Sequence, residues 1–136
     1  ASRAADYQQE TARRVAAELL ESLPRVDGIV CANDVMALGA IEALQKAGRS
    51  IPLVGVNAIP EAIAAIKSGK LFATVSFDAM HISSIATEAA IRHLRGERLP
   101  AEIILPVSIV DASNYRPWDR PLEERVPPRW EDVVSR

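Results

Sequence analysis

The sequence predicts an α/β fold in which a parallel sheet is flanked by helices. Short apolar runs rich in β-branched residues, typical of strands buried on both faces, alternate with stretches in which apolar residues recur every three or four positions. Glycine or proline closes most of these segments. Helices and strands that alternate at this spacing indicate parallel strands joined by right-handed crossovers.

The first 77 residues contain three helix–strand pairs. We expect Asp6 to cap the first helix and Asp34 to cap the second, because a short acidic side chain can accept hydrogen bonds from a helix N-terminus. Gly48 and Gly69 follow the second and third helices, as left-handed C-terminal residues do. The predicted elements are, in order, helix 12–23, strand 26–32, helix 35–47, strand 51–56, helix 61–68 and strand 71–75.

The remaining residues follow a different pattern. A helix is predicted over 80–95 and a strand over 102–110, with Pro106 marking a bend, bulge or edge within that strand. Residues 112–136 contain four prolines and both tryptophans. The prolines argue against a continuous element and the tryptophans against disorder, so we expect an extended tail on the surface.

Composition excludes several classes of function. The net charge of −2 is too close to zero for a nucleic-acid binder, and no predicted helix carries the basic face of a membrane-surface helix. No apolar run approaches the roughly 20 residues of a membrane span. Cys31 is the single cysteine, so it forms no internal disulfide, and its apolar surroundings predict a buried thiol.

Polar or bulky side chains directly follow each of the first three predicted strands. These are the pair Asn33 and Asp34, then Asn57, then Phe77 with Asp78. In parallel sheets, ligands bind beyond the carboxyl ends of the strands, so these residues predict a binding crevice at that edge.

No constellation for catalysis is visible. The sequence has no nucleophile elbow and no glycine-rich phosphate loop, so we expect neither an enzyme nor a bound cofactor. His81 and His93 lack neighbouring cysteines or carboxylates arranged for a metal ion, and no metal site is predicted.

Residues 31–40, Cys-Ala-Asn-Asp-Val-Met-Ala-Leu-Gly-Ala, resemble the ribose/galactose-type periplasmic binding proteins. The resemblance continues through 53–57, 63–71 and 73–75 and covers roughly residues 1–111. It implies a type 1 periplasmic binding fold, built from two Rossmann-like lobes that close on a ligand. It also implies a periplasmic solute-binding component of an ABC importer, which delivers a monosaccharide or polyol to a membrane permease.

The resemblance further implies that this chain is an incomplete, later part of such a protein. Residues 1–77 would form the C-terminal lobe, and 78–101 a helix that packs on the absent N-terminal lobe. Residues 102–111 would cross back between lobes, and 112–136 would form the tail. An uncovered helix 80–95 would then favour self-association of the chain.

The family's ligand contacts carry over to five positions. Tyr7 corresponds to a stacking aromatic ring, and Asn33 to an amide that binds hydroxyls. Asn57 stands where an aspartate is frequent, and Phe77 stands next to Asp78 where a glutamine is common, so the ligand need not be ribose. Tyr7 and Phe77 could instead serve packing, and Asn33 and Asn57 could be structural loop amides.

A second function is compatible with the same fold. The effector-binding domain of a LacI-type transcription regulator shares these lobes, but such a regulator carries a basic helix-turn-helix that this sequence lacks.

Overall fold

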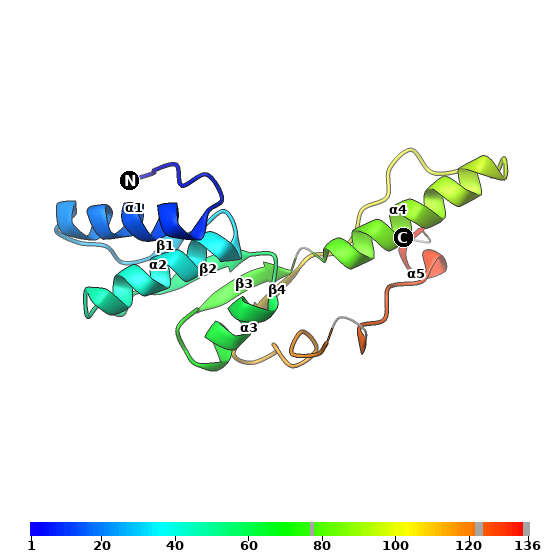
Figure 1. Cartoon of the computed structure of the whole chain (residues 1–136). Helices are drawn as coiled ribbons and strands as arrows, with labels where there is room; N and C mark the ends of the chain where they lie inside the picture. Colours follow the sequence, from blue (N-terminus) through cyan, green and yellow to red (C-terminus); the bar gives the residue numbers. More distant parts are fainter. Residues whose placement is uncertain (77, 122–123, 135–136) are drawn as a thin grey trace. The chain divides into compact units, whose positions relative to one another are not determined.

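The computed structural model describes residues 1–76, 78–121 and 124–134 (Figure 1). The chain divides into two compact units. Unit one comprises Ala1–Phe77 and Ser108–Asp119, and unit two comprises Asp78–Val107 and Arg120–Arg136. The elements of unit one are α1 (Gln9–Ser22), β1 (Ile29–Val30), α2 (Asp34–Lys46), β2 (Leu53–Val56), α3 (Pro60–Lys67), β3 (Ala73–Ser76) and β4 (Ser108–Asp111). Those of unit two are α4 (Ala79–Leu94) and α5 (Trp130–Val134).

The sheet of unit one has the strand order β1-β2-β3-β4. The first three strands are parallel, as predicted from their alternation with helices. The strand β4 is antiparallel to β3, with Val75 opposite Ile109. It begins at Ser108, so the predicted strand over 102–110 is correct only at its end. Pro106 has no N–H to donate to a ladder, which explains why pairing starts after it.

The core of unit one lies between the sheet and its helices. Its fully buried side chains include Leu53 in β2, Ile63 and Ile66 in α3, and Val110 in β4. Residues 112–119 form turns rather than the predicted extended tail, and Tyr115 and Trp118 pack against this core. The indole N–H of Trp118 donates to Ser76 Oγ at 3.0 Å, which ties the turn to the end of β3.

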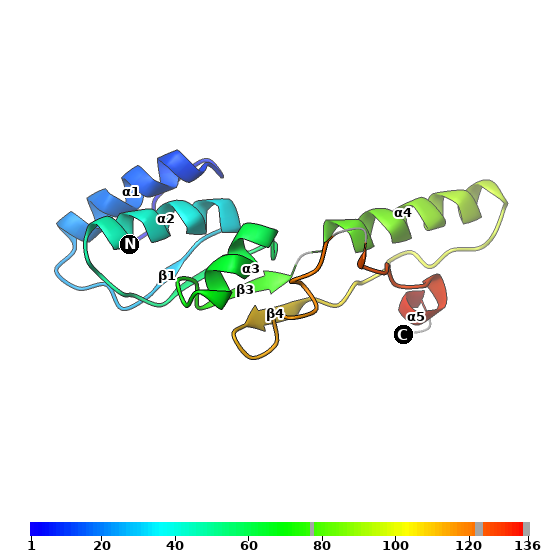
Figure 2. The ribbon, with the colours of Figure 1, turned by 60° about the horizontal axis from the view of Figure 1, so that its bottom comes forward.

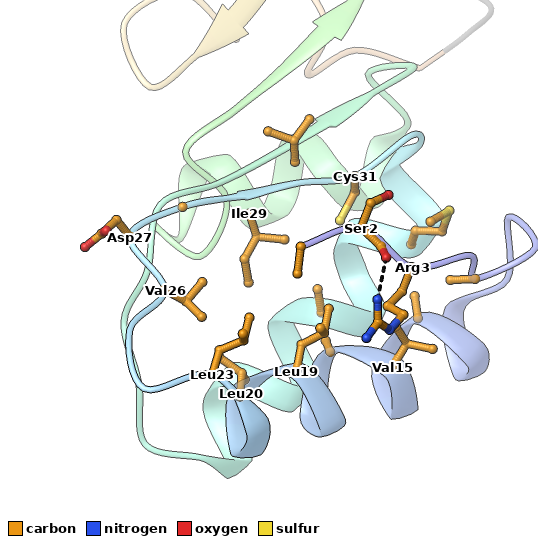
Figure 3. A pocket seen from close by; sticks show the side chains of 18 of the residues that line it. Ser2, Arg3, Val15, Leu19, Leu20, Leu23, Val26, Asp27, Ile29 and Cys31 are labelled. Atoms are coloured by element: carbon orange, nitrogen blue, oxygen red, sulfur yellow. Dashed lines mark hydrogen bonds between the residues drawn. The ribbon is translucent and has the colours of Figure 1, made fainter.

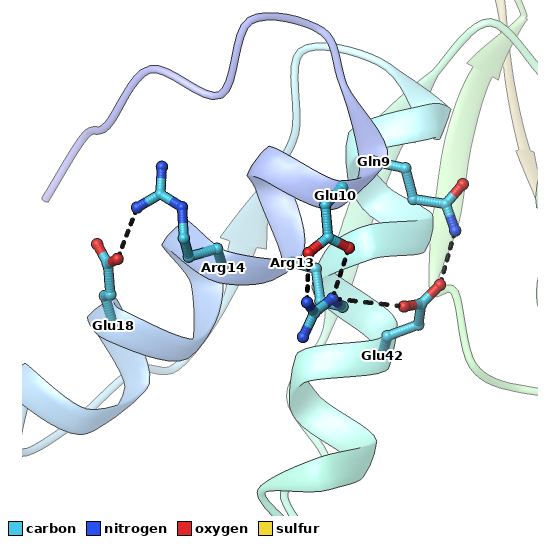
Figure 4. Close-up of polar contacts among 6 residues, drawn as sticks. All are labelled: Gln9, Glu10, Arg13, Arg14, Glu18 and Glu42. Atoms are coloured by element: carbon cyan, nitrogen blue, oxygen red, sulfur yellow. Dashed lines mark hydrogen bonds and ion pairs between the residues drawn. The ribbon is translucent and has the colours of Figure 1, made fainter.

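Helix α1 lies along α2, and the two backbones approach closely at Gly39 (Figures 1 and 2). A Cβ atom at this position would lie 2.1 Å from the carbonyl oxygen of Gln9 and 2.9 Å from the amide nitrogen of Arg13. Around this contact, the Gln9 amide donates to Glu42 at 2.6 Å, and Arg13 pairs with Glu10 (Figure 4). Exposed ion pairs of this kind contribute little to stability, so the close approach is decided by the glycine.

We predict that Gly39→Ala destabilises unit one by about 1 to 3 kcal/mol, because the new methyl group meets backbone atoms that cannot rotate away. The matched control is Gly28→Ala, where the nearest atom is a carbonyl oxygen of Pro52 at 3.7 Å, an ordinary contact. Urea unfolding of both variants checks this. A Gly39→Ala protein as stable as Gly28→Ala would contradict the proposed close packing.

The free edge of β1 borders a cavity of about 480 Å³ (Figure 3). Strand β1 is the terminal strand of the sheet, and Val30 is 85% exposed. The cavity is lined mostly by apolar side chains of α1 and β1, such as Val15, Leu19 and Ile29, together with the first residues of the chain. Packing on this side of the sheet is therefore incomplete.

Arg92 links the two helices of unit two. Arg92 in α4 pairs with Glu88 and Glu97 and lies 4.9 Å from the centre of the Trp130 ring at the start of α5. The predicted extended tail thus contains a short helix, α5. Contacts with α4 stabilise this helix, and the prolines of the tail lie before it in the chain. Ile85 is the buried residue of α4.

Candidate ligand-binding site

The strands β1, β2 and β3 point toward one edge of unit one, and helices α1 and α2 begin there (Figure 1). Asn33 lies between β1 and α2, Asn57 follows β2, and Tyr7 precedes α1. The structure therefore brings three of the five predicted binding residues to the carboxyl edge of the sheet. Their contact with a ligand stays a prediction.

Asn33 is the N-cap of α2. Its Oδ1 accepts a hydrogen bond from the Met36 N–H at 2.9 Å, which satisfies one of the free donors of the first helical turn. The prediction that Asp34 is the cap was wrong by one residue. Since the bond uses the oxygen of the Asn33 amide, the NH₂ group is the part that can donate to a ligand hydroxyl.

Asn57 and Ala58 have positive φ angles of 120° and 56°. Two consecutive residues other than glycine in this region are strained, and such strain persists only where neighbouring contacts enforce it. Here the Asn57 N–H donates to the Val75 carbonyl at 2.8 Å, and the Ala58 N–H donates to Thr74 Oγ1 at 3.3 Å. The backbone that carries the Asn57 amide is therefore fixed from below by β3.

Asp34 is completely buried beneath this edge. Its Oδ1 accepts from the Thr74 hydroxyl at 2.7 Å and its Oδ2 from the Ile59 N–H at 3.0 Å. Burial raises the pKa of Asp34, and the hydrogen bonds from Thr74 and Ile59 oppose that rise without cancelling it. Gly55 makes room for the carboxylate, since a Cβ there would lie 2.3 Å from Asp34 Oδ1.

Thr74 and Gly55 were not predicted from the sequence as part of this site. Both stand within apolar strands, at positions where a larger apolar residue would be expected. A hydroxyl and a missing side chain on neighbouring buried strands are the sequence signal of a buried polar partner, and Asp34 is that partner.

We predict that Asp34 makes stability depend on pH. Because its pKa in the folded protein lies above the ordinary value of 3.8, the folded state holds this proton more tightly than the unfolded chain. The stability that Asp34 contributes is therefore complete below that value and falls as the pH rises through the folded-state pKa. The unfolding free energy of the wild type, minus that of Asp34→Asn, should decrease as the pH rises above the ordinary pKa of 3.8. A difference that stays constant or rises would refute the raised pKa.

Tyr7 is 68% exposed and lies in a left-handed turn, with φ angles of 52° at Asp6 and 58° at Tyr7. The prediction of Asp6 as N-cap was wrong, since Gln8 occupies that position without a side-chain capping bond. The turn places the phenol ring in the open, which is what stacking on the C–H face of a sugar requires.

The other two predicted residues are Phe77 and Asp78. Phe77 lies outside the described residues. Asp78 belongs to unit two, where its Oδ1 accepts from the N–H groups of Met80 and His81 at 3.1 and 3.2 Å and so caps α4. Capping of α4 therefore gives the Asp78 carboxylate a structural role. A contact of Asp78 with a ligand stays a prediction.

The cavity beside β1 is not this site, because Tyr7, Asn33 and Asn57 do not line it (Figure 3). Within residues 1–76, 78–121 and 124–134, no group of three His, Cys, Asp or Glu side chains is placed to hold a metal ion. Burial and the nearby Asp34 raise the pKa of Cys31 to about 11, so this thiol stays protonated. No helix in the described part of the chain is long and apolar enough to cross a bilayer.

Residues 1–98 match the periplasmic binding protein domain family. The chain belongs to this family. A ribose import binding protein of Bacillus subtilis is 35% identical over 105 residues, which cover 77% of this chain and 34% of that protein. Family members bind solutes and are not enzymes, in agreement with the absence of a catalytic motif in the sequence.

Two solved structures show the same fold. A solute-binding protein of Actinobacillus succinogenes with bound D-allose superposes with a TM-score of 0.80 at 30% identity, over 82% of this chain and 40% of that one. One from Bacillus halodurans with bound myo-inositol gives 0.79 at 31% identity, over 85% and 40%. The chain thus spans about a third of the Bacillus subtilis relative and two fifths of these structures.

Proposed function

We propose that this chain contributes one side of the sugar site in the solute-binding component of an ABC importer. The observation that carries the proposal is the carboxyl edge of unit one. There, two side-chain amides stand on loops with fixed backbones, and an exposed tyrosine ring stands beside the start of α1. Amides pair with hydroxyls and aromatic rings stack on sugar C–H faces, so this set suits a small polyhydroxylated ligand.

The relatives support a monosaccharide or polyol as the ligand class. Proteins of the same family are named for ribose import or hold D-allose or myo-inositol in their structures. Asn57 both donates and accepts hydrogen bonds, whereas a carboxylate at that position would only accept. The ligand of this chain would therefore present different donors and acceptors from a ligand that binds to an aspartate there.

The proposed setting is the periplasm. Ligand would bridge this lobe and a second one and would bind the closed form more tightly than the open form. The closed form would then dock on a membrane permease. An effector domain of a transcription regulator has the same fold. The relatives described above are named for import and solute binding, which favours the importer.

We predict that D-ribose, D-allose or myo-inositol shifts the NMR resonances of Tyr7, Asn33 and Asn57 in a titration of this protein. Asn57→Ala should weaken the binding by about tenfold or more, because the site then loses a hydrogen-bond partner of the sugar. The matched control is Gln45→Ala, which removes an exposed amide at the far end of α2.

Two results would contradict the proposal. One is a ligand that shifts residues around the cavity beside β1 and leaves the carboxyl edge unchanged. The other is an equal loss of binding in Asn57→Ala and Gln45→Ala, which would show that the amide at the carboxyl edge has no special part in recognition.

A further inference from the structure

We propose that Asp34 and Thr74 are positioning residues of the sugar site, which fix the Asn57 loop relative to Asn33 without touching the ligand. This inference rests on the proposed function, because it concerns the same site. It assigns a role to two buried polar side chains that sugar contact does not explain.

The first step is the position of Asp34 in the chain. It directly follows Asn33 and is the first residue of α2, so the backbone of Asn33 cannot move independently of Asp34. The Asp34 carboxylate then reaches 25 residues along the chain to accept from the Ile59 N–H at 3.0 Å. One side chain therefore joins the loop after β1 to the loop after β2.

The second step is the relay through Thr74. Its hydroxyl donates to Asp34 Oδ1 at 2.7 Å and accepts from the Ala58 N–H at 3.3 Å. Ala58 has a φ of 56° and directly follows Asn57. The hydroxyl thus holds the strained residue next to the predicted ligand amide, and β3, from which it projects, is paired with β2 on one side and with β4 on the other.

The third step is the cost of the arrangement. A carboxylate that is fully buried is unfavourable unless each of its oxygens is hydrogen-bonded, and no donor other than backbone and hydroxyl groups is seen on it among the described residues. A core that served stability alone would be satisfied by apolar side chains at both positions. Thr74 and Asp34 instead accept hydrogen bonds from the N–H groups of Ala58 and Ile59, the two residues that follow Asn57. This pattern indicates that the two side chains fix the geometry of the Asn57 loop.

The test compares Thr74→Val, which keeps the shape and removes the hydroxyl, with Thr74→Ser, which keeps the hydroxyl. Leu53→Ala is the matched control, because Leu53 is fully buried at the amino end of β2 and its loss destabilises the fold away from the site. Thr74→Ala replaces Thr74→Val if the latter does not fold. Two readouts are taken for each protein: hydrogen exchange of the Ala58 amide without ligand, and NMR titration with D-ribose, D-allose and myo-inositol.

We expect Thr74→Val to speed exchange of the Ala58 amide and to weaken sugar binding about tenfold or more, with Thr74→Ser and Leu53→Ala close to the wild type in affinity. Unchanged Ala58 exchange in Thr74→Val would overturn the inference at the relay through Thr74. Faster exchange with unchanged affinity would overturn the positioning role and leave the proposed function standing. A wild type in which none of the three sugars shifts Asn33 or Asn57 would overturn the proposed function itself, whatever the Ala58 amide does.

Discussion

The buried carboxylate of Asp34 is the constraint on which this edge of the lobe depends. A charge-bearing group without solvent must find donors, and the surrounding chain supplies them from a hydroxyl on β3 and from the backbone after β2. Gly55 is required next to it because any side chain would occupy the space of the carboxylate. The strands β2 and β3 and the loop after β2 are therefore matched to one side chain.

Much of the fold of unit one follows from sequence pattern, and the errors have local causes. The alternation of strands and helices predicts β1 to β3 and α1 to α3, because each buried face leaves a periodic trace. Asn33 and Asp34 exchange roles because either can cap a helix, and only the tertiary partner Thr74 decides between them. The antiparallel direction of β4 and the helix α5 depend on distant contacts, such as Arg92 with Trp130, which no local pattern encodes.

Part of the candidate site could also be predicted from the strand pattern. Residues after parallel strands meet at one edge, so Asn33 and Asn57 could be placed together from the strand pattern alone. Tyr7 could be assigned only through the family resemblance, because nothing in a helix-entry residue distinguishes a ring that stacks on a ligand from one that packs on a neighbour. The strained backbone at Asn57 and Ala58 became visible only in three dimensions, since neither is the glycine that usually marks such a turn.

The free edge of β1 also bears on how the protein behaves in concentrated solution. Unpaired strand edges recruit other strands, and long flat edges initiate aggregation. The ladder of β1 extends over just two residues, Ile29 and Val30, so an incoming strand would gain few hydrogen bonds from it. Among the described residues, β1 therefore offers little template for pairing with a strand of another molecule.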